Sequence, residues 1–89
     1  MVSIKKLVLD ILKPHQPDAI DFTQSIAKSG DDYRVRLLLL EMDENTETIQ
    51  IEVRGRSLDF TAIKTAISDM GGSLHSIDAV EVHSEPESK

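Results

Sequence analysis

The order of its strand-like and helix-like segments limits the fold of this chain more than any other sequence feature. Four segments have the alternating or continuous apolar pattern of strands, and two have the spacing and end signals of helices. The expected strands cover residues 4–12, 32–43, 48–54 and 74–82, and the expected helices cover residues 17–30 and 57–72. Two right-handed crossovers joined by a hairpin predict an α+β, ferredoxin-like βαββαβ sandwich. Its four-stranded antiparallel sheet would have the order 4-1-3-2, with both helices on one face.

The two expected helices have recognisable ends. Pro17 and Asp18 suit the first turn of the first helix, and Gly30 ends it. In the second helix Asp59 is a good N-cap, and Gly71 closes the other end. The residues expected to form the buried stripe of the first helix are Ile20, Phe22, Ile26 and Ala27.

The second expected strand lies at an edge of this sheet, yet "VRLLLLEM" is apolar on both faces. Exposed edge strands normally avoid this pattern, because their free backbone groups invite pairing with another chain. One interpretation is a buried strand that is simply rich in leucine. We favour the other, in which Leu38, Leu40 and Met42 are covered by a second copy of the chain. Pairing of the second strand with the fourth strand of a neighbour would give a homo-oligomer, and a ring where the rotation closes.

A single domain is expected over residues 1–83, because a chain of 89 residues builds one small core and no repeat or linker interrupts it. Residues 84–89, "SEPESK", contain no apolar residue and are expected to form a disordered tail. Asp10 and Lys13 interrupt the N-terminal apolar run, which argues against a signal peptide, and no segment reaches membrane-spanning length. We therefore expect a cytoplasmic protein without a membrane partner.

Composition excludes several functional classes. The absence of cysteine excludes disulfides, thiolate metal sites and cysteine nucleophiles. The net charge of −6 repels phosphate backbones, and the outward positions of the first and third expected strands carry no aromatic residue for base stacking. Binding of nucleic acid is therefore not expected. No glycine-rich phosphate loop is present, and no organic cofactor is indicated.

Polar residues gather at one end of the expected sheet, where the first loop, the hairpin and the start of the last strand all emerge. The group comprises His15, Glu41, Asp43, Glu44, Glu47 and His75, with Asp10 lower on the helix-free face. Carboxylates with imidazole are ligands for Ca²⁺, Mg²⁺, Mn²⁺ or Zn²⁺. We predict Glu41, Asp43 and Glu47 as ligands of a divalent cation. The alternative is a set of acidic side chains that are only solvated.

The stretch "GGSLHSIDAV" raises a separate question about the last strand. In a regular strand His75 and Asp78 point to opposite faces, but Leu74 and Ile77 have the same spacing and both suit the core. A β-bulge near Ser76 would reconcile them. We predict Asp10, His15, His75, Ser76 and Asp78 as ligand-binding residues. The alternative is a bulge whose polar residues only cap an edge or contact a neighbouring subunit.

The segments "LVLDILKPHQP", "LLEMDENTE", "RSLDF" and "GGSLHSIDAV" resemble a small archaeal family, domain-of-unknown-function family 211, over residues 4–80. The resemblance implies a ferredoxin-like fold and small homo-oligomers, allows a bound divalent cation, and implies no activity. Gln16 departs from the family, which often has an acidic residue there, and this weakens a ligand role for the turn. The family's motif positions match Asp10, Lys13, Pro14, His15, Glu41, Asp43, Glu47, His75, Ser76 and Asp78.

Two functional hypotheses follow. The first is a non-enzymatic, homo-oligomeric binding or regulatory protein that takes a small ligand or a divalent cation; the regulatory role rests on fold analogy. The second is a metal-dependent enzyme that uses the histidine and carboxylate end of the sheet as acid, base or metal site. No serine lies in a nucleophile-elbow context, so nucleophilic catalysis is not expected.

Overall fold

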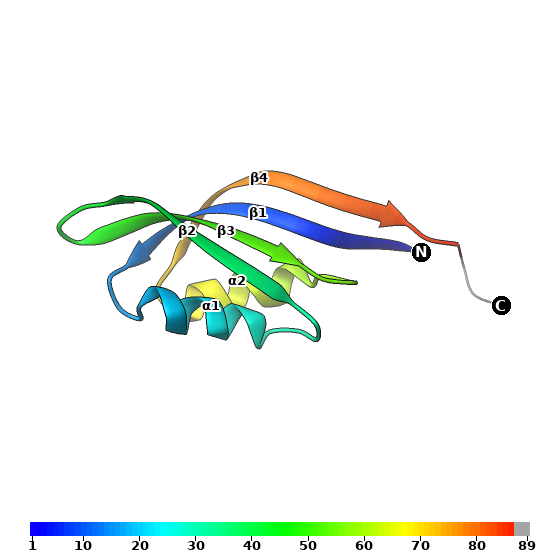
Figure 1. Ribbon diagram of the computed structural model, residues 1–89, viewed down its shortest axis with the longest axis horizontal. Coiled ribbons are helices and arrows are strands. Elements are labelled where there is room, and N and C mark those ends of the chain that lie inside the picture. The colour runs from blue at the N-terminus through cyan, green and yellow to red at the C-terminus, as the bar shows by residue number, and fades with distance from the viewer. Residues whose placement is uncertain (87–89) are drawn as a thin grey trace.

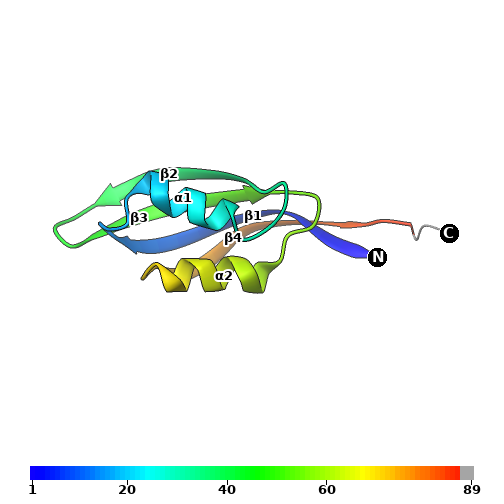
Figure 2. The ribbon, with the colours of Figure 1, turned by 90° about the horizontal axis from the view of Figure 1, so that it is seen from below.

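The computed structural model describes residues 1–86 and contains four strands and two helices in the expected order. One sheet has the order β2-β3-β1-β4, and every neighbouring pair is antiparallel. Both helices lie on one face of this sheet (Figure 1 and Figure 2). The predicted ferredoxin-like α+β fold is therefore confirmed. The strands are β1 (Val2–Pro14), β2 (Arg34–Met42), β3 (Thr46–Arg54) and β4 (Ser73–Ser84), and the helices are α1 (Ala19–Ala27) and α2 (Phe60–Asp69).

The core lies between the helices and alternate residues of the two central strands. These residues pair directly across β1 and β3: Leu7 with Val53, Leu9 with Ile51, and Ile11 with Ile49. All six are buried, together with Phe22 and Ile26 from α1 and Ile63 and Ile67 from α2. Burial of one such side chain stabilises the fold by about 1.5–3 kcal/mol. The alternation of apolar residues in the segment 48–54 indicates this inward face.

Helix α1 begins later than expected, and one of the residues predicted for its buried stripe is exposed. Asp18 is its N-cap. A side-chain oxygen of Asp18 accepts a hydrogen bond from the backbone N–H of Asp21 at 2.9 Å. Pro17 lies before the cap, where it forms a cis peptide bond with Gln16. The prediction that Ile20 belongs to the buried stripe is wrong, since its side chain is 66% exposed.

Helix α2 has the predicted ends. The carboxylate of Asp59 accepts a hydrogen bond from the backbone N–H of Ala62 at 3.0 Å. Gly71 follows the helix with a φ of +82°, a conformation that suits glycine because it has no Cβ. A Cβ at Gly72 would lie 2.8 Å from Ile67 and 3.1 Å from Phe22, so this position needs glycine for close packing.

Strand β2 lies at one edge of the sheet, as predicted, but its side chains do not alternate regularly. The pairing with β3 shifts between Leu39 and Glu41, which leaves Leu40 as an extra residue. Met42 then pairs with Glu47 and lies on the same face as Leu39, not on the face of Leu38. The prediction that Leu38, Leu40 and Met42 share one face is therefore wrong for Met42.

Strand β4 forms the other edge and contains the phase break that the apolar spacing predicts. Leu74 pairs with Ile11 and Ile77 pairs with Leu9, so both lie on the helix-facing side of the sheet. Register shifts on either side of Ser76 allow this, one at His75 and one at Asp78.

The two layers differ in length. β1 has 13 residues and, at about 3.3 Å per residue, is about 40 Å long, whereas the nine residues of α1 span about 14 Å. The β2–β3 hairpin extends past the helices at one end, and the start of β1 and the end of β4 extend past them at the other (Figure 1). The sheet is therefore covered on one face only along its middle.

The last strand reaches further than the predicted domain boundary at residue 83. Ser84 pairs with Val2, and the backbone N–H of Glu85 donates to the carbonyl of Met1 at 2.7 Å. The remainder of the predicted disordered tail, residues 87–89, lies outside the described residues, and the tail stays a prediction there. No helix within residues 1–86 is both long and apolar enough to cross a membrane.

Candidate functional site

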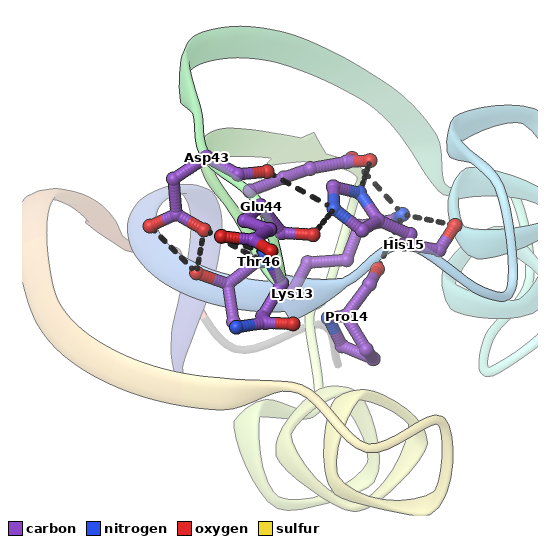
Figure 3. Close-up of polar contacts among 8 residues, drawn as sticks. Lys13, Pro14, His15, Asp43, Glu44 and Thr46 are labelled. Atoms are coloured by element: carbon purple, nitrogen blue, oxygen red, sulfur yellow. Dashed lines mark hydrogen bonds and ion pairs between the residues drawn. The ribbon is translucent and has the colours of Figure 1, made fainter.

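The first loop and the hairpin meet at the polar end of the sheet because β1 and β3 are paired to their ends. Lys13 stands opposite Glu47, and Pro14 stands opposite Thr46. His15 follows directly and lies against the hairpin (Figure 3). Lys13, His15 and Glu47 form a hydrogen-bonded cluster, which we call the hairpin clasp.

Lys13 is the buried member of the clasp. Its side chain is fully buried, and Nζ donates to Oε1 of Glu47 at 3.1 Å and to the carbonyl of Pro14 at 2.9 Å. The carbonyl of His15 lies 3.5 Å from the same nitrogen. Nζ also lies 5.7 Å from the ring centroid of Phe22, within the range of a cation–π contact. These contacts replace the water that a buried ammonium has lost.

His15 is held through both ring nitrogens. Nδ1 lies 2.8 Å from Oε2 of Glu47, and Nε2 lies 3.1 Å from the carbonyl oxygens of Asp43 and Glu44. All of these partners are acceptors, so both nitrogens must carry a proton for every contact to be a hydrogen bond. The bond to Glu47, followed by that to the carbonyl of Glu44, raises the pKa of His15 above its ordinary value. The clasp therefore favours the imidazolium form.

The two acidic hairpin residues have different roles. Oδ1 of Asp43 accepts from the backbone N–H groups of Thr46 at 2.8 Å and Asn45 at 3.0 Å, and these bonds lower the pKa of its carboxyl. Asp43 thus shapes the turn itself. The carboxylate of Glu47 bonds to His15 and then to Lys13, and these two contacts lower the pKa of Glu47.

The predicted cation ligands do not converge into one site. Asp43 and Glu47 are engaged in the bonds above, while Glu41 is exposed and pairs with Thr48 on the helix-free face. Within residues 1–86 no three His, Cys, Asp or Glu side chains are grouped closely enough to hold a metal ion. The divalent cation stays a prediction.

The predicted ligand-binding residues fall into two separate groups. His15 belongs to the clasp, whereas Asp10 pairs with Ser76 across β1 and β4. The hydroxyl of Ser76 donates to Oδ1 of Asp78 at 2.7 Å. His75 is exposed, and among the residues described here no hydrogen bond joins it to Asp78. Ser76 and Asp78 therefore form a local polar pair on the bulged edge strand, with no hydrogen bond to the clasp among the described residues.

The burial of Lys13 was not predicted from the pattern of the residues. The signal was present, because Lys13 continues the odd-numbered series Leu7, Leu9 and Ile11 that faces the core. A charged residue at an inward position of a central strand indicates a buried partner, and Glu47 is that partner.

The stability of the fold is expected to depend on pH through the clasp. The pKa of His15 is raised above 6.5, so its contribution is complete below pH 6.5 and is lost as pH rises through the raised value. The pKa of Glu47 is lowered below 4.5, so its contribution is complete above pH 4.5 and is lost as pH falls through the lowered value. The urea concentration at the midpoint of unfolding should therefore be highest between pH 4.5 and pH 6.5.

The His15→Gln variant isolates the alkaline side of this profile. In wild type the urea midpoint should decline above pH 6.5. His15→Gln should lose this decline, while the exposed control His83→Gln should retain it. An unchanged alkaline decline in His15→Gln would contradict the assignment.

Comparison with known proteins relates most of the chain to a family of uncharacterised proteins. The model of domain-of-unknown-function family 211, described as "Uncharacterized ArCR", matches residues 5–85. A protein of Methanocaldococcus jannaschii, "Uncharacterized protein MJ0319", is 38% identical over 80 residues, which cover 90% of this chain and 82% of that protein. The family has no assigned function. The chain belongs to domain-of-unknown-function family 211.

Proposed function

We propose that this protein assembles with copies of itself through the two edges of its sheet and serves a binding or regulatory role. One observation carries the proposal: both edge strands expose large apolar side chains. On β2 the side chains of Leu38, Leu40 and Met42 are 45–57% exposed, and on β4 those of Ile77, Val80 and Val82 are 46–51% exposed. Unpaired strands with such side chains favour association with another strand.

Strand direction supports contact between unlike edges. The strands alternate in direction across the sheet, so β2 and β4 run in opposite directions. A neighbour's β2 placed beside β4 would continue the antiparallel sheet without interruption. Such a contact joins different surfaces, so it closes into a ring when the rotation permits.

Charge supports the same pairing. Exposed Arg34 and Arg36 lie on β2, whereas Asp78 and Glu81 lie on β4. Arg34 on β2 pairs with Arg54 on β3, which pairs with Lys6 on β1, which pairs with Glu81 on β4. Arg34 and Glu81 therefore lie at the same level of the sheet, on opposite edges. In a register that keeps this level, pairing β2 with β4 brings opposite charges together.

We favour a binding or regulatory role over metal-dependent catalysis. The side chain of Glu47 is already bonded to His15 and Lys13, and that of Asp43 to the backbone of the hairpin. An enzyme would need these groups to be free to exchange protons or to ligate a metal.

Variants at the two edges test the assembly. Sedimentation velocity of wild type should report a homo-oligomer, and Leu40→Asp on β2 or Val80→Asp on β4 should each give a monomer. Each variant keeps one intact edge, so mixing them in equal amounts should give a dimer. Ile20→Asp, on the exposed face of α1, is the matched control and should assemble as wild type does.

The mixture of Leu40→Asp and Val80→Asp distinguishes contact between β2 and β4 from contact between two identical strands. A contact between two β2 strands would leave Val80→Asp assembled, and mixing would restore nothing. A monomeric wild-type protein at micromolar concentration would overturn the proposal.

A further inference from the structure

The end of the sheet opposite the clasp contains a cleft of about 560 Å³. Its lining comes from the start of β1, the loops on either side of the β2–β3 pair, and Glu85 after β4. At this end β1 and β4 extend past the helices (Figure 1). We propose that this cleft binds a small anion with a carboxylate or phosphate group, and that Glu85 occupies the anion's position in the free protein. The argument uses none of the exposed apolar side chains of β2 and β4, so this inference does not depend on the proposed assembly.

Ser3 is the first indication of a ligand. It lines the cleft and is only 8% exposed. Within residues 1–86 no side-chain oxygen is both fully buried and unpaired, and the Ser3 hydroxyl makes no side-chain hydrogen bond there, so it stays accessible from the cleft. A donor in this position is available to an oxygen atom of a bound anion.

Lys5 provides the positive charge that would attract an anion into the cleft. Its Nζ donates to the carbonyl of Arg56 at 2.6 Å and forms an ion pair with the carboxylate of Glu85. The Lys5 side chain is 18% exposed, whereas that of Glu85 is 47% exposed. The fold therefore fixes the cation in the cleft, while its carboxylate partner lies at the surface and is free to leave.

Glu85 shows which chemistry the position accepts. Its backbone pairs with Met1, which brings the carboxylate to Lys5. Exposed ion pairs contribute little to stability, because water competes for both charges. A ligand with its own carboxylate or phosphate can therefore replace Glu85 and also reach the hydroxyl of Ser3.

The other charges of the cleft limit the size of the anion. Arg56 lines the cleft but is paired with Asp32, with Nε 3.1 Å from the carboxylate. Asp31 also lines the cleft and would repel additional negative charge. The protein as a whole has a net charge of −6. These charges fit a small anion with one or two negative groups and oppose a polyanion such as a nucleic acid.

Amide NMR titrations of the full-length protein test the inference. The probes are inorganic phosphate and succinate, each compared with sodium chloride at the same ionic strength. In Glu85→Gln, the amides of residues 3–5 and 56–57 should shift with at least one probe, about threefold to tenfold more tightly than in wild type, because the internal competitor has gone. Glu81→Gln makes the same charge change on β4 outside the cleft and should bind as wild type does.

Two further variants identify the contacts. Lys5→Gln should abolish binding, and Ser3→Ala should weaken it in the Glu85→Gln background, which provides a second test if Lys5→Gln does not fold. Shifts with phosphate alone assign a phosphate ligand, and shifts with succinate alone assign a carboxylate ligand. If neither probe shifts the cleft amides of Glu85→Gln, or if Glu85→Gln and Glu81→Gln bind equally, the inference is overturned.

Discussion

Replacing Lys13 with methionine should lower the free energy of unfolding by about 3 kcal/mol, because removal of one partner of a buried ion pair leaves the carboxylate of Glu47 with His15 as its remaining cationic partner. Methionine has a similar length, so little cavity forms. Glu47, whose side chain is only 12% exposed, would lose its contact with Nζ, and the carbonyls of Pro14 and His15 would lose a donor. Urea denaturation followed by circular dichroism measures the change.

A surface lysine and a double variant serve as controls. Lys64→Met removes the same charge from an exposed position on α2 and should change stability by less than about 0.5 kcal/mol. Lys13→Met combined with Glu47→Gln should recover part of the loss, because the carboxylate that has lost its lysine partner is gone. A loss below about 1 kcal/mol in Lys13→Met would mean that the pair is not buried as described.

Replacing Phe22 with alanine should cost about 4 kcal/mol, which is typical of a fully buried aromatic residue. Phe22 is fully buried, lies beneath the ammonium of Lys13 and packs close to Gly72. Its loss would remove core contacts and the aromatic face below the clasp together. Thermal and urea denaturation would measure the difference.

The matched control lies on the same helix. Ile20→Ala removes an exposed apolar side chain two residues away and should change stability by less than about 0.5 kcal/mol. Comparable losses in the two variants would contradict the observed orientation of α1.

Much of the fold could be predicted because alternation and helix ends are local signals. The inward residues Ile49, Ile51 and Val53 and the N-cap Asp59 lie where the pattern indicates. The prediction is wrong at Ile20, which it places in the buried stripe of the first helix together with Phe22. Residues two apart on a helix point in nearly opposite directions, so Ile20 and Phe22 cannot share a buried face.

The site was harder to predict because it depends on register and burial. The spacing of Leu74 and Ile77 indicated an irregular strand, and register shifts do flank Ser76. Asp78 bonds to Ser76, whereas His15 bonds to Glu47 of the hairpin, so the predicted ligand-binding residues form two groups. The bond between Lys13 and Glu47 could not be derived from local pattern, because it follows from the pairing of strands whose residues are 34 positions apart.

The pairing of β1 with β4 also affects how the protein is made. β1 lies in the middle of the sheet, yet one of its two neighbours is the last strand to leave the ribosome. A nascent chain can pair β1 with β3 earlier, but one side of β1 then stays open until residues 73–84 emerge. During that interval the exposed backbone of β1 is where a chaperone would bind or an incorrect strand would pair.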